Sequence, residues 1–110
     1  MAQDYKILGQ ITPSAGVLTN LHVTGASTQA AIGTITVSGL FETSNSSFSL
    51  VVRPINEALE EKHFIFRGSV VAPNEVLVIS GAVTMDENTI LAANSSTGNA
   101  HFTAFGVEIT

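Results

Sequence analysis

Apolar residues in this chain recur at every second position, and this period constrains the fold more than any other feature. In residues 32–37 isoleucine and valine are interleaved with threonine and glycine, and Phe48, Leu50 and Val52 are spaced by two. Successive side chains of a strand point to opposite faces, whereas an amphipathic helix repeats about every 3.6 residues. Thr, Val and Ile also favour a pleated, half-buried backbone. The pattern therefore predicts a chain built from β-strands.

Short polar connections divide the chain into extended segments. Residues 13–16 fit a turn that starts with Pro and ends with Gly, and residues 43–46 and 94–99 fit polar hairpin tips. The eight predicted strands are 5–11, 17–23, 31–37, 47–53, 63–66, 75–79, 89–93 and 99–109. Short strands at this spacing are typical of an all-β sandwich or barrel. We predict an antiparallel β-sandwich of jelly-roll or immunoglobulin-like type.

One segment departs from the period of two. Residues 55–62 are rich in helix formers, follow Pro54 and offer Asn56 as an N-cap, but they are too few for a stable helix. We expect a loop with at most one helical turn that bridges the two sheets. Without an internal repeat or a linker, residues 1–110 are predicted to form one domain. Residues 1–12 form either an ordinary first strand or an arm or swapped strand that reaches a neighbour.

The composition excludes several classes of function. The chain has no Cys, which excludes a disulfide framework, a thiolate metal site and a thiol nucleophile. Four Lys and Arg against nine Asp and Glu give a formal charge of −5, with no basic patch for nucleic acid. Its apolar runs are shorter than the roughly 20 residues of a membrane helix, and no secretory signal is visible. We expect a soluble protein made in a cytoplasm, without nucleic-acid or membrane partners.

Charge is also sparse. Charged residues make up 12% of the chain, whereas the surface of a lone domain carries roughly 25–35%. A surface of Ser, Thr, Asn and Gly favours contact with other protein over much of its area.

No set of residues has a catalytic or metal-binding spacing. His22, His63 and His101 are far apart, and neither His-x-His nor His-Glu-x-x-His occurs. The acidic group at residues 57–61 lies in a polar loop, where a solvated face is the better interpretation. Nucleophile elbows and phosphate-binding loops are missing. We predict a protein that is not an enzyme, with no catalytic residues, no cofactor and no metal.

The phenylalanines are expected in the core. Phe64 and Phe66 are predicted on one face of a strand, and Phe102 and Phe105 lie near the end of the chain. An exposed aromatic row would instead suit stacking against sugars or bases.

Several motifs occur in a fixed order along the chain. They are residues 8–10 and 18–23 near the start, 49–54, 62–66 and 72–75 in the middle, and 102–110 at the end. As a set they resemble a family of small virion structural proteins of tailed bacteriophages, of the marine cyanophage type. The resemblance implies a β-sandwich without catalysis that assembles into the virion. The neck, tail, fibre and head lattice are all compatible with it.

We therefore expect a virion structural protein that self-assembles and stabilises the particle, with a capsid decoration or cement protein as the first interpretation. The alternative is a tail, neck or fibre component that binds a receptor or glycan. The expected partners are further copies of the chain, as a homo-oligomer with a trimer as one option, and other virion proteins such as the major capsid protein.

Candidate contact residues follow from this interpretation. Leu40 and Phe41 are apolar beside a polar turn, and Arg53 is a rare cation suited to a bidentate contact, or to pairing within its own subunit with a nearby glutamate. The others lie in the N-terminal segment and in the irregular loop. The candidate interface residues are Tyr5, Ile7, Leu40, Phe41, Arg53, Glu57, Leu59 and Glu60.

Overall fold

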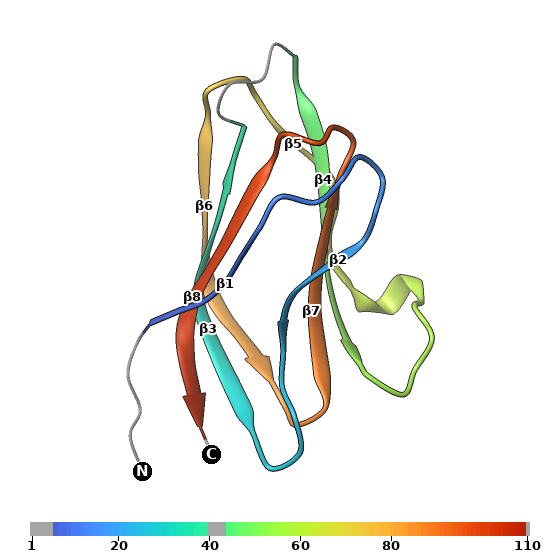
Figure 1. Cartoon of the computed structure of the whole chain (residues 1–110), viewed down its shortest axis with the longest axis vertical. Helices are drawn as coiled ribbons and strands as arrows, with labels where there is room; N and C mark the ends of the chain where they lie inside the picture. The colour runs from blue at the N-terminus through green and yellow to red at the C-terminus, as the bar shows by residue number, and fades with distance from the viewer. Residues whose placement is uncertain (1–5, 40–43, 110) are drawn as a thin grey trace.

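Strands account for most of the chain, as the period of two predicts. The computed structural model describes residues 6–39 and 44–109, and Figure 1 shows its strands and its one short helical turn. The strands are β1 (Lys6–Ile11), β2 (Thr19–Val23), β3 (Gln29–Ser38), β4 (Ser46–Pro54), β5 (Phe64–Val71), β6 (Val76–Met85), β7 (Thr89–Ser95) and β8 (His101–Ile109), and the 3-10 turn η1 spans Glu61–His63. Each predicted segment overlaps one of these strands, so the all-β prediction is confirmed.

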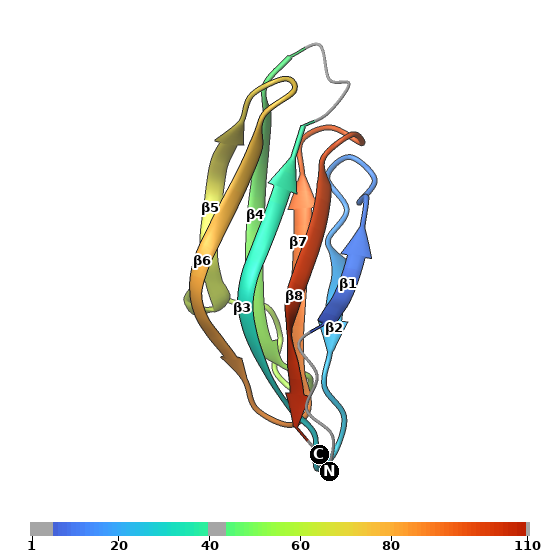
Figure 2. The same ribbon diagram turned by 90° about the vertical axis from the view of Figure 1, so that its left-hand side faces the viewer.

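The strands form two antiparallel sheets that face each other (Figure 2). Sheet I has the order β1-β8-β3-β6, and sheet II has the order β2-β7-β4-β5. β1 pairs with β8, β2 with β7, β3 with β6 and β4 with β5, which is the pattern of an antiparallel ribbon rolled up on itself. An eight-stranded double sheet of this kind is a jelly roll, and its order differs from that of an immunoglobulin domain. Of the two predicted sandwich types, the jelly roll is the one observed.

The core lies between the sheets, where the residues of period two meet. Val37 and Phe102 of sheet I and Phe48 and Leu50 of sheet II are each at most 2% exposed. The rings of Phe48 and Phe102 pack edge to face, with their centroids 5.9 Å apart, a favourable aromatic geometry. Burying a side chain of this size contributes about 1.5–3 kcal/mol. The alternation along the strands is thus what holds the two sheets together.

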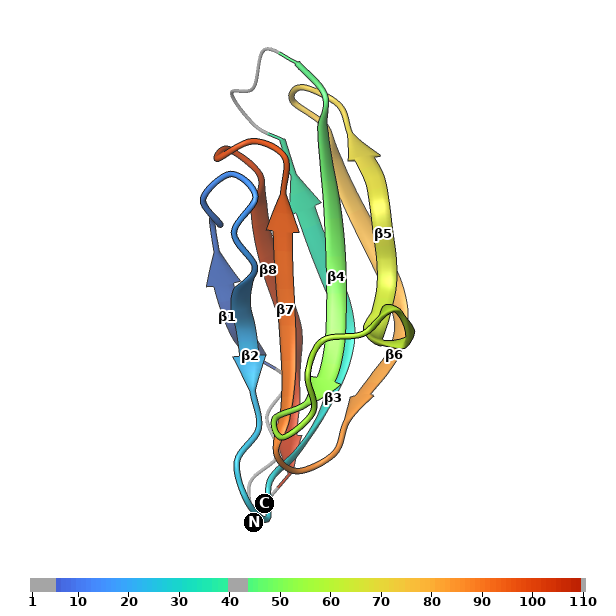
Figure 3. The ribbon, with the colours of Figure 1, turned by 90° about the vertical axis from the view of Figure 1, so that its right-hand side faces the viewer.

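β1 and β2 come into direct contact along one side of the sandwich (Figure 3). A Cβ atom added at Gly9 of β1 would lie 1.9 Å from the carbonyl oxygen of Leu21 in β2. Leu21 is buried in the core, and Leu8 and Ile11 pack against the core from β1. Glycine is required at this approach because every other residue carries a Cβ atom. β1 pairs with β8 of the same chain, so the described part of the N-terminal segment is an edge strand of its own sheet.

The connection from β4 to β5 folds back over the outer face of sheet II (Figure 3). Val51, Ile90 and Ala92 alternate with core residues such as Leu50 and Leu91 and therefore point away from the core. They are nevertheless at most 8% exposed. Sheet II is thus covered on both faces where this connection crosses it, which leaves sheet I with the more open outer surface.

The helical turn predicted in this connection is present, but near its end. The stretch around Asn56 instead forms a turn in which the Glu57 N–H donates to the Pro54 carbonyl at 3.2 Å. The backbone N–H of His63 donates to the Glu60 carbonyl at 3.1 Å, and the Glu60 N–H donates to Nδ1 of the His63 ring at 2.9 Å. The helical turn starts after Glu60, and the His63 side chain accepts a hydrogen bond from the backbone N–H of that residue. The prediction of Asn56 as N-cap is therefore wrong.

A bulge separates the two phenylalanines of β5. Phe66 pairs with Leu50 and Phe64 with Val51, with a shift of register between them. Since Leu50 faces the core and Val51 does not, the prediction that Phe64 and Phe66 share a face is wrong. Phe66 packs against the core, whereas the guanidinium carbon of Arg67 lies 5.0 Å from the centroid of the Phe64 ring.

Candidate functional site

The outer face of sheet I carries no Lys, Arg, Asp or Glu among the residues that the structure describes. Its members alternate with the core residues of the same strands, and the strand register aligns them in rows, such as Gln10, Thr103, Thr36 and Val78. We call this surface the sheet I face. It comprises Ile7 and Gln10 of β1, His101, Thr103, Phe105 and Val107 of β8, Ala31, Thr34, Thr36 and Ser38 of β3, and Val76, Val78, Ser80 and Thr84 of β6.

This composition suits contact with another protein. The centres of protein interfaces are depleted of charged residues, since burying an unpaired charge costs several kcal/mol. Threonine and serine hydroxyls both donate and accept hydrogen bonds, so they can be satisfied by a partner's backbone or by bridging water. The core prediction for Phe105 is corrected here: its strand parity places it on the sheet I face, where it is half-buried, while Phe102 is in the core.

Charged side chains gather elsewhere. Many lie around the β4–β5 connection, and Glu75, Asp86 and Glu87 flank β6 at its two ends. Glu108 of β8 points inward, with its Oε2 atom 3.5 Å from Nε2 of His22 in β2. This pair joins one sheet to the other and keeps the Glu108 charge off the sheet I face.

Glu57 is the centre of the charged group in the β4–β5 connection. Its Oε1 atom lies 3.4 Å from Nζ of Lys62 and 3.4 Å from Nε2 of His63. The hydrogen bond and positive charge of Lys62 hold the pKa of Glu57 below its usual 4.5; burial opposes this shift and His63 adds to it. Because Nδ1 of His63 accepts a hydrogen bond from the Glu60 N–H, the neutral tautomer of the ring has its N–H at Nε2, which faces the Glu57 carboxylate. The contacts of Glu57 with Lys62 and His63 stabilise the β4–β5 connection.

Arg53 bonds within its own chain. Its Nη1 atom donates to the backbone carbonyl of Glu57 at 2.7 Å. Pairing of Arg53 with the carboxylate of Glu57 or Glu61 was one expectation, and the bond observed goes to the backbone instead. The half-buried guanidinium thereby ties the strand end of β4 to the connection that covers sheet II.

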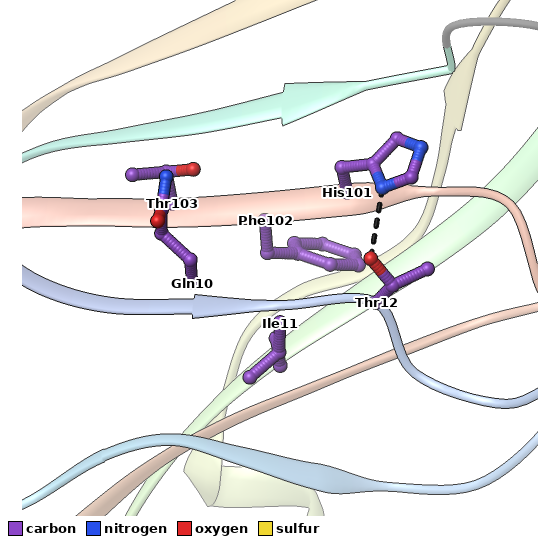
Figure 4. A pocket seen from close by; sticks show the side chains of 6 residues that line it. All are labelled: Gln10, Ile11, Thr12, His101, Phe102 and Thr103. Atoms are coloured by element: carbon purple, nitrogen blue, oxygen red, sulfur yellow. Dashed lines mark hydrogen bonds between the residues drawn. The ribbon is translucent and has the colours of Figure 1, made fainter.

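A shallow pocket of about 290 Å³ lies between β1 and β8 (Figure 4). The Oγ1 atom of Thr12 and Nδ1 of His101 are 2.8 Å apart at one end of it. Hydroxyl, amide and imidazole groups line it together with two apolar side chains, and carboxylate and ammonium groups do not. The lining residues are Gln10, Ile11, Thr12, His101, Phe102 and Thr103. The pocket therefore fits a small neutral polar group better than an ion.

The structure divides the predicted contact residues between two places. Ile7 lies exposed on the sheet I face, whereas Arg53, Glu57, Leu59 and Glu60 belong to the β4–β5 region over sheet II. Tyr5, Leu40 and Phe41 lie outside the described residues.

Sequence reasoning missed most of the sheet I face. A signal was available, because residues 29–38, 76–85 and 101–107 contain no charged residue at all. What turns these separate stretches into one surface is that β3, β6 and β8 are neighbours in sheet I.

The three histidines lie in different parts of the fold, each with its own partner. The pairs are His22 with Glu108, His63 with Glu57, and His101 with Thr12. In residues 6–39 and 44–109, no group of three or more His, Cys, Asp or Glu side chains is placed to hold a metal ion. The same residues include no helix that is long and apolar enough to span a membrane.

Comparisons of the chain with protein-family models, with curated proteins and with solved structures gave no match. A function must therefore be inferred from the sheet I face, the charged β4–β5 region over sheet II and the pocket between β1 and β8.

Proposed function

We propose that this protein is a non-enzymatic structural component of a bacteriophage particle, which it stabilises as a capsid decoration protein. The observation that carries the proposal is the sheet I face, on which four strands present neutral side chains. A second protein can cover such a face without desolvating any Lys, Arg, Asp or Glu from it.

The distribution of charge gives the docked molecule an orientation. Among the described residues, most charged side chains lie in the loops and on the side of sheet II. When the sheet I face rests on the shell, these charges remain in water, where their solvation is retained and they keep particles apart. The face supplies complementarity and the opposite side supplies solubility.

The fold and the motifs support a particle protein in particular. Jelly rolls occur among viral capsid and lectin domains, although a fold by itself does not define a function. The motifs that resemble virion structural proteins lie largely in strands: residues 49–54 belong to β4 and residues 102–109 to β8. They build the framework of the sandwich, as expected for a protein that acts through surface shape.

Cryo-electron microscopy of particles that carry this protein tests the proposal. We expect density of this size against the shell, with the sheet I face turned inward. Thr36→Asp places a carboxylate in the middle of the face, and Asn20→Asp places the same charge on the exposed outer side of β2. Thr36→Asp should lower occupancy at least tenfold, and Asn20→Asp should leave it unchanged.

Circular dichroism must first show that both variants keep the wild-type β signal. Absence of the protein from purified particles, contact through sheet II, or equal incorporation of both variants would refute the decoration role.

A second candidate function is favoured by the pocket between β1 and β8. Its neutral polar lining suits a saccharide hydroxyl group, as in a receptor- or glycan-binding module of a tail or fibre. Titration with neutral monosaccharides, followed by amide chemical shifts, tests this function. Shifts confined to the pocket and lost in Thr103→Val would support it, and unchanged spectra at about 10 mM sugar, tenfold above a Kd of about 1 mM, would reject it.

A further inference from the structure

β5 and β6 are the edge strands of the two sheets, and they lie on the same side of the sandwich (Figure 2). This side exposes an unusual amount of apolar surface. Ile65 and Val70 of β5 are 41% and 53% exposed, and Val76 and Val78 of β6 are 51% and 62% exposed. We call this region the β5/β6 side.

The core is also less completely covered there. Leu77 and Ile79 of β6 and Phe66 of β5 point toward the core but are only partly buried. On the opposite side, the approach of Gly9 to Leu21 brings β1 and β2 together. Apolar surface therefore continues around the β5/β6 side, from the outer valines of β6 to the rim of the core.

Residues 76–80 of β6 lack the features that normally prevent strand pairing. Edge strands are commonly protected by charges, proline, bulges or short length. β1 starts with Lys6 and is bulged, β2 has 5 residues, and β5 carries Arg67. Residues 76–80 contain no charge and no proline, and the register of β3 with β6 is regular along them. The backbone groups along this edge can be satisfied by another extended strand.

We propose that two copies of this chain associate through antiparallel pairing of β6 with β6, centred on Val78. This inference deepens the assembly role proposed above by naming the partner and the edge. In the paired strands Val78 lies opposite its own counterpart, Val76 lies opposite Ser80, and Leu77 lies opposite Ile79. The last pair covers the partly buried rim of each core with the other copy.

The charge-free stretch of β6 is where two copies can meet with the least repulsion. Two molecules of formal charge −5 repel each other, so they associate best where charges are absent. In this register the two copies of Glu75 are separated by six residue steps, or about 20 Å at about 3.4 Å per residue. That exceeds the screening length of about 8 Å at physiological salt. The pairing also joins the two sheet I faces into one continuous neutral surface.

Cysteine cross-linking tests the pairing, since the chain has no Cys of its own. Directly opposed residues of antiparallel strands have Cα atoms about 4.5–5.5 Å apart, within the range of about 4.4–6.8 Å that a disulfide needs. Val78→Cys should therefore form a covalent dimer under mild oxidation. The two copies of residue 76 lie four residue steps, or about 14 Å, apart in this register, so Val76→Cys should not. The double variant Val76→Cys with Ser80→Cys should cross-link again.

Sedimentation equilibrium on the full chain gives a second measurement. The wild type should dimerise, and Val78→Asp, which places two like charges together at the axis, should raise the dimer dissociation constant at least tenfold. Val23→Asp is the matched control, because Val23 is a 41% exposed valine on edge strand β2. It should dimerise as the wild type does.

A wild type that is still monomeric at a protein concentration of about 100 µM, 100-fold above a dimer Kd of about 1 µM, overturns the proposal. Cross-linking of Val76→Cys at the rate of Val78→Cys overturns it as well. This failure differs from failure of the decoration role: a monomer that still occupies particles removes only the β6 pairing, and a dimer that is absent from particles removes only the decoration role.

Discussion

Gly9→Ala should weaken this fold strongly, although it adds only one methyl group. The added Cβ atom would lie 1.9 Å from the carbonyl oxygen of Leu21. Close carbon–oxygen contacts in proteins are about 3.3 Å or longer, so β1 and β2 would have to move apart by more than about 1 Å. Backbone stands on both sides of this contact, and rotation of a side chain does not relieve it.

Two ways of relieving the contact bound the free-energy cost. If β1 stays in place, the strain is that of an overpacked core, which costs about 1–3 kcal/mol. If β1 detaches instead, Leu8 and Ile11 lose the packing that they make against the core, at no more than about 1.5–3 kcal/mol each. Since the chain takes whichever route costs less, we expect the free energy of unfolding to fall by about 1–3 kcal/mol.

Urea unfolding measures this loss. For a denaturant dependence of about 2 kcal/mol per molar, the middle of the range for small proteins, the midpoint should fall by about 0.5–1.5 M. Gly25→Ala is the matched control, since no atom lies within 4 Å of a Cβ atom added there, and its unfolding free energy should stay within about 1 kcal/mol of the wild type. A wild-type midpoint for Gly9→Ala would refute the close approach of β1 to β2.

Arg53→Ala should lower the free energy of unfolding by about 2 kcal/mol, because it removes a charge-assisted hydrogen bond to the Glu57 carbonyl, whereas Lys6→Ala at an exposed position should change it by less than about 0.5 kcal/mol. Equal midpoints for the two variants in urea would contradict this reasoning. The lowered pKa of Glu57 means that its ionised form is favoured in the folded state. Its stabilising effect is therefore present above about pH 4.5 and is lost as the pH falls through the folded pKa. The difference in stability between wild type and Glu57→Gln should shrink between pH 6 and pH 3, and a constant difference would contradict the Lys62 pairing. Phe102→Ala should cost about 3–5 kcal/mol because its side chain is fully buried against Phe48, while Phe105→Ala on the sheet I face should cost clearly less in thermal unfolding; the reverse order would reverse the assignment of faces on β8.

The strand content was predictable because the signals for it are local. Alternating apolar residues and Pro, Gly and Asn turns act within a few residues, and all of the predicted segments overlap observed strands. The predicted ends failed at β5 and β6, which continue to Val71 and Met85. Gly68 and Gly81 look like breaks in sequence, but β5 and β6 are edge strands, which tolerate an irregular residue because one side is unpaired.

The candidate contact residues were predictable only in part. Ile7 in the N-terminal segment and Leu59 in the irregular loop stand out in the sequence as apolar residues, and both are exposed. Threonines such as Thr36 and Thr103 attract no notice one at a time. They form a surface because β3 and β8 pair in a register that aligns them.

By itself, the sequence determined that this chain is a small all-β protein without cysteine and with few charged residues. The period and the turns are properties of neighbouring residues, and the composition is a count. Only the tertiary structure decided that the strands roll into a jelly roll, that neutral side chains share the sheet I face, and that β5 and β6 leave one side uncovered. These features depend on pairings such as Ile7 with Phe105, between residues almost a full chain apart. No local pattern specifies such partners, because they are chosen by which sheets can bury their apolar faces together.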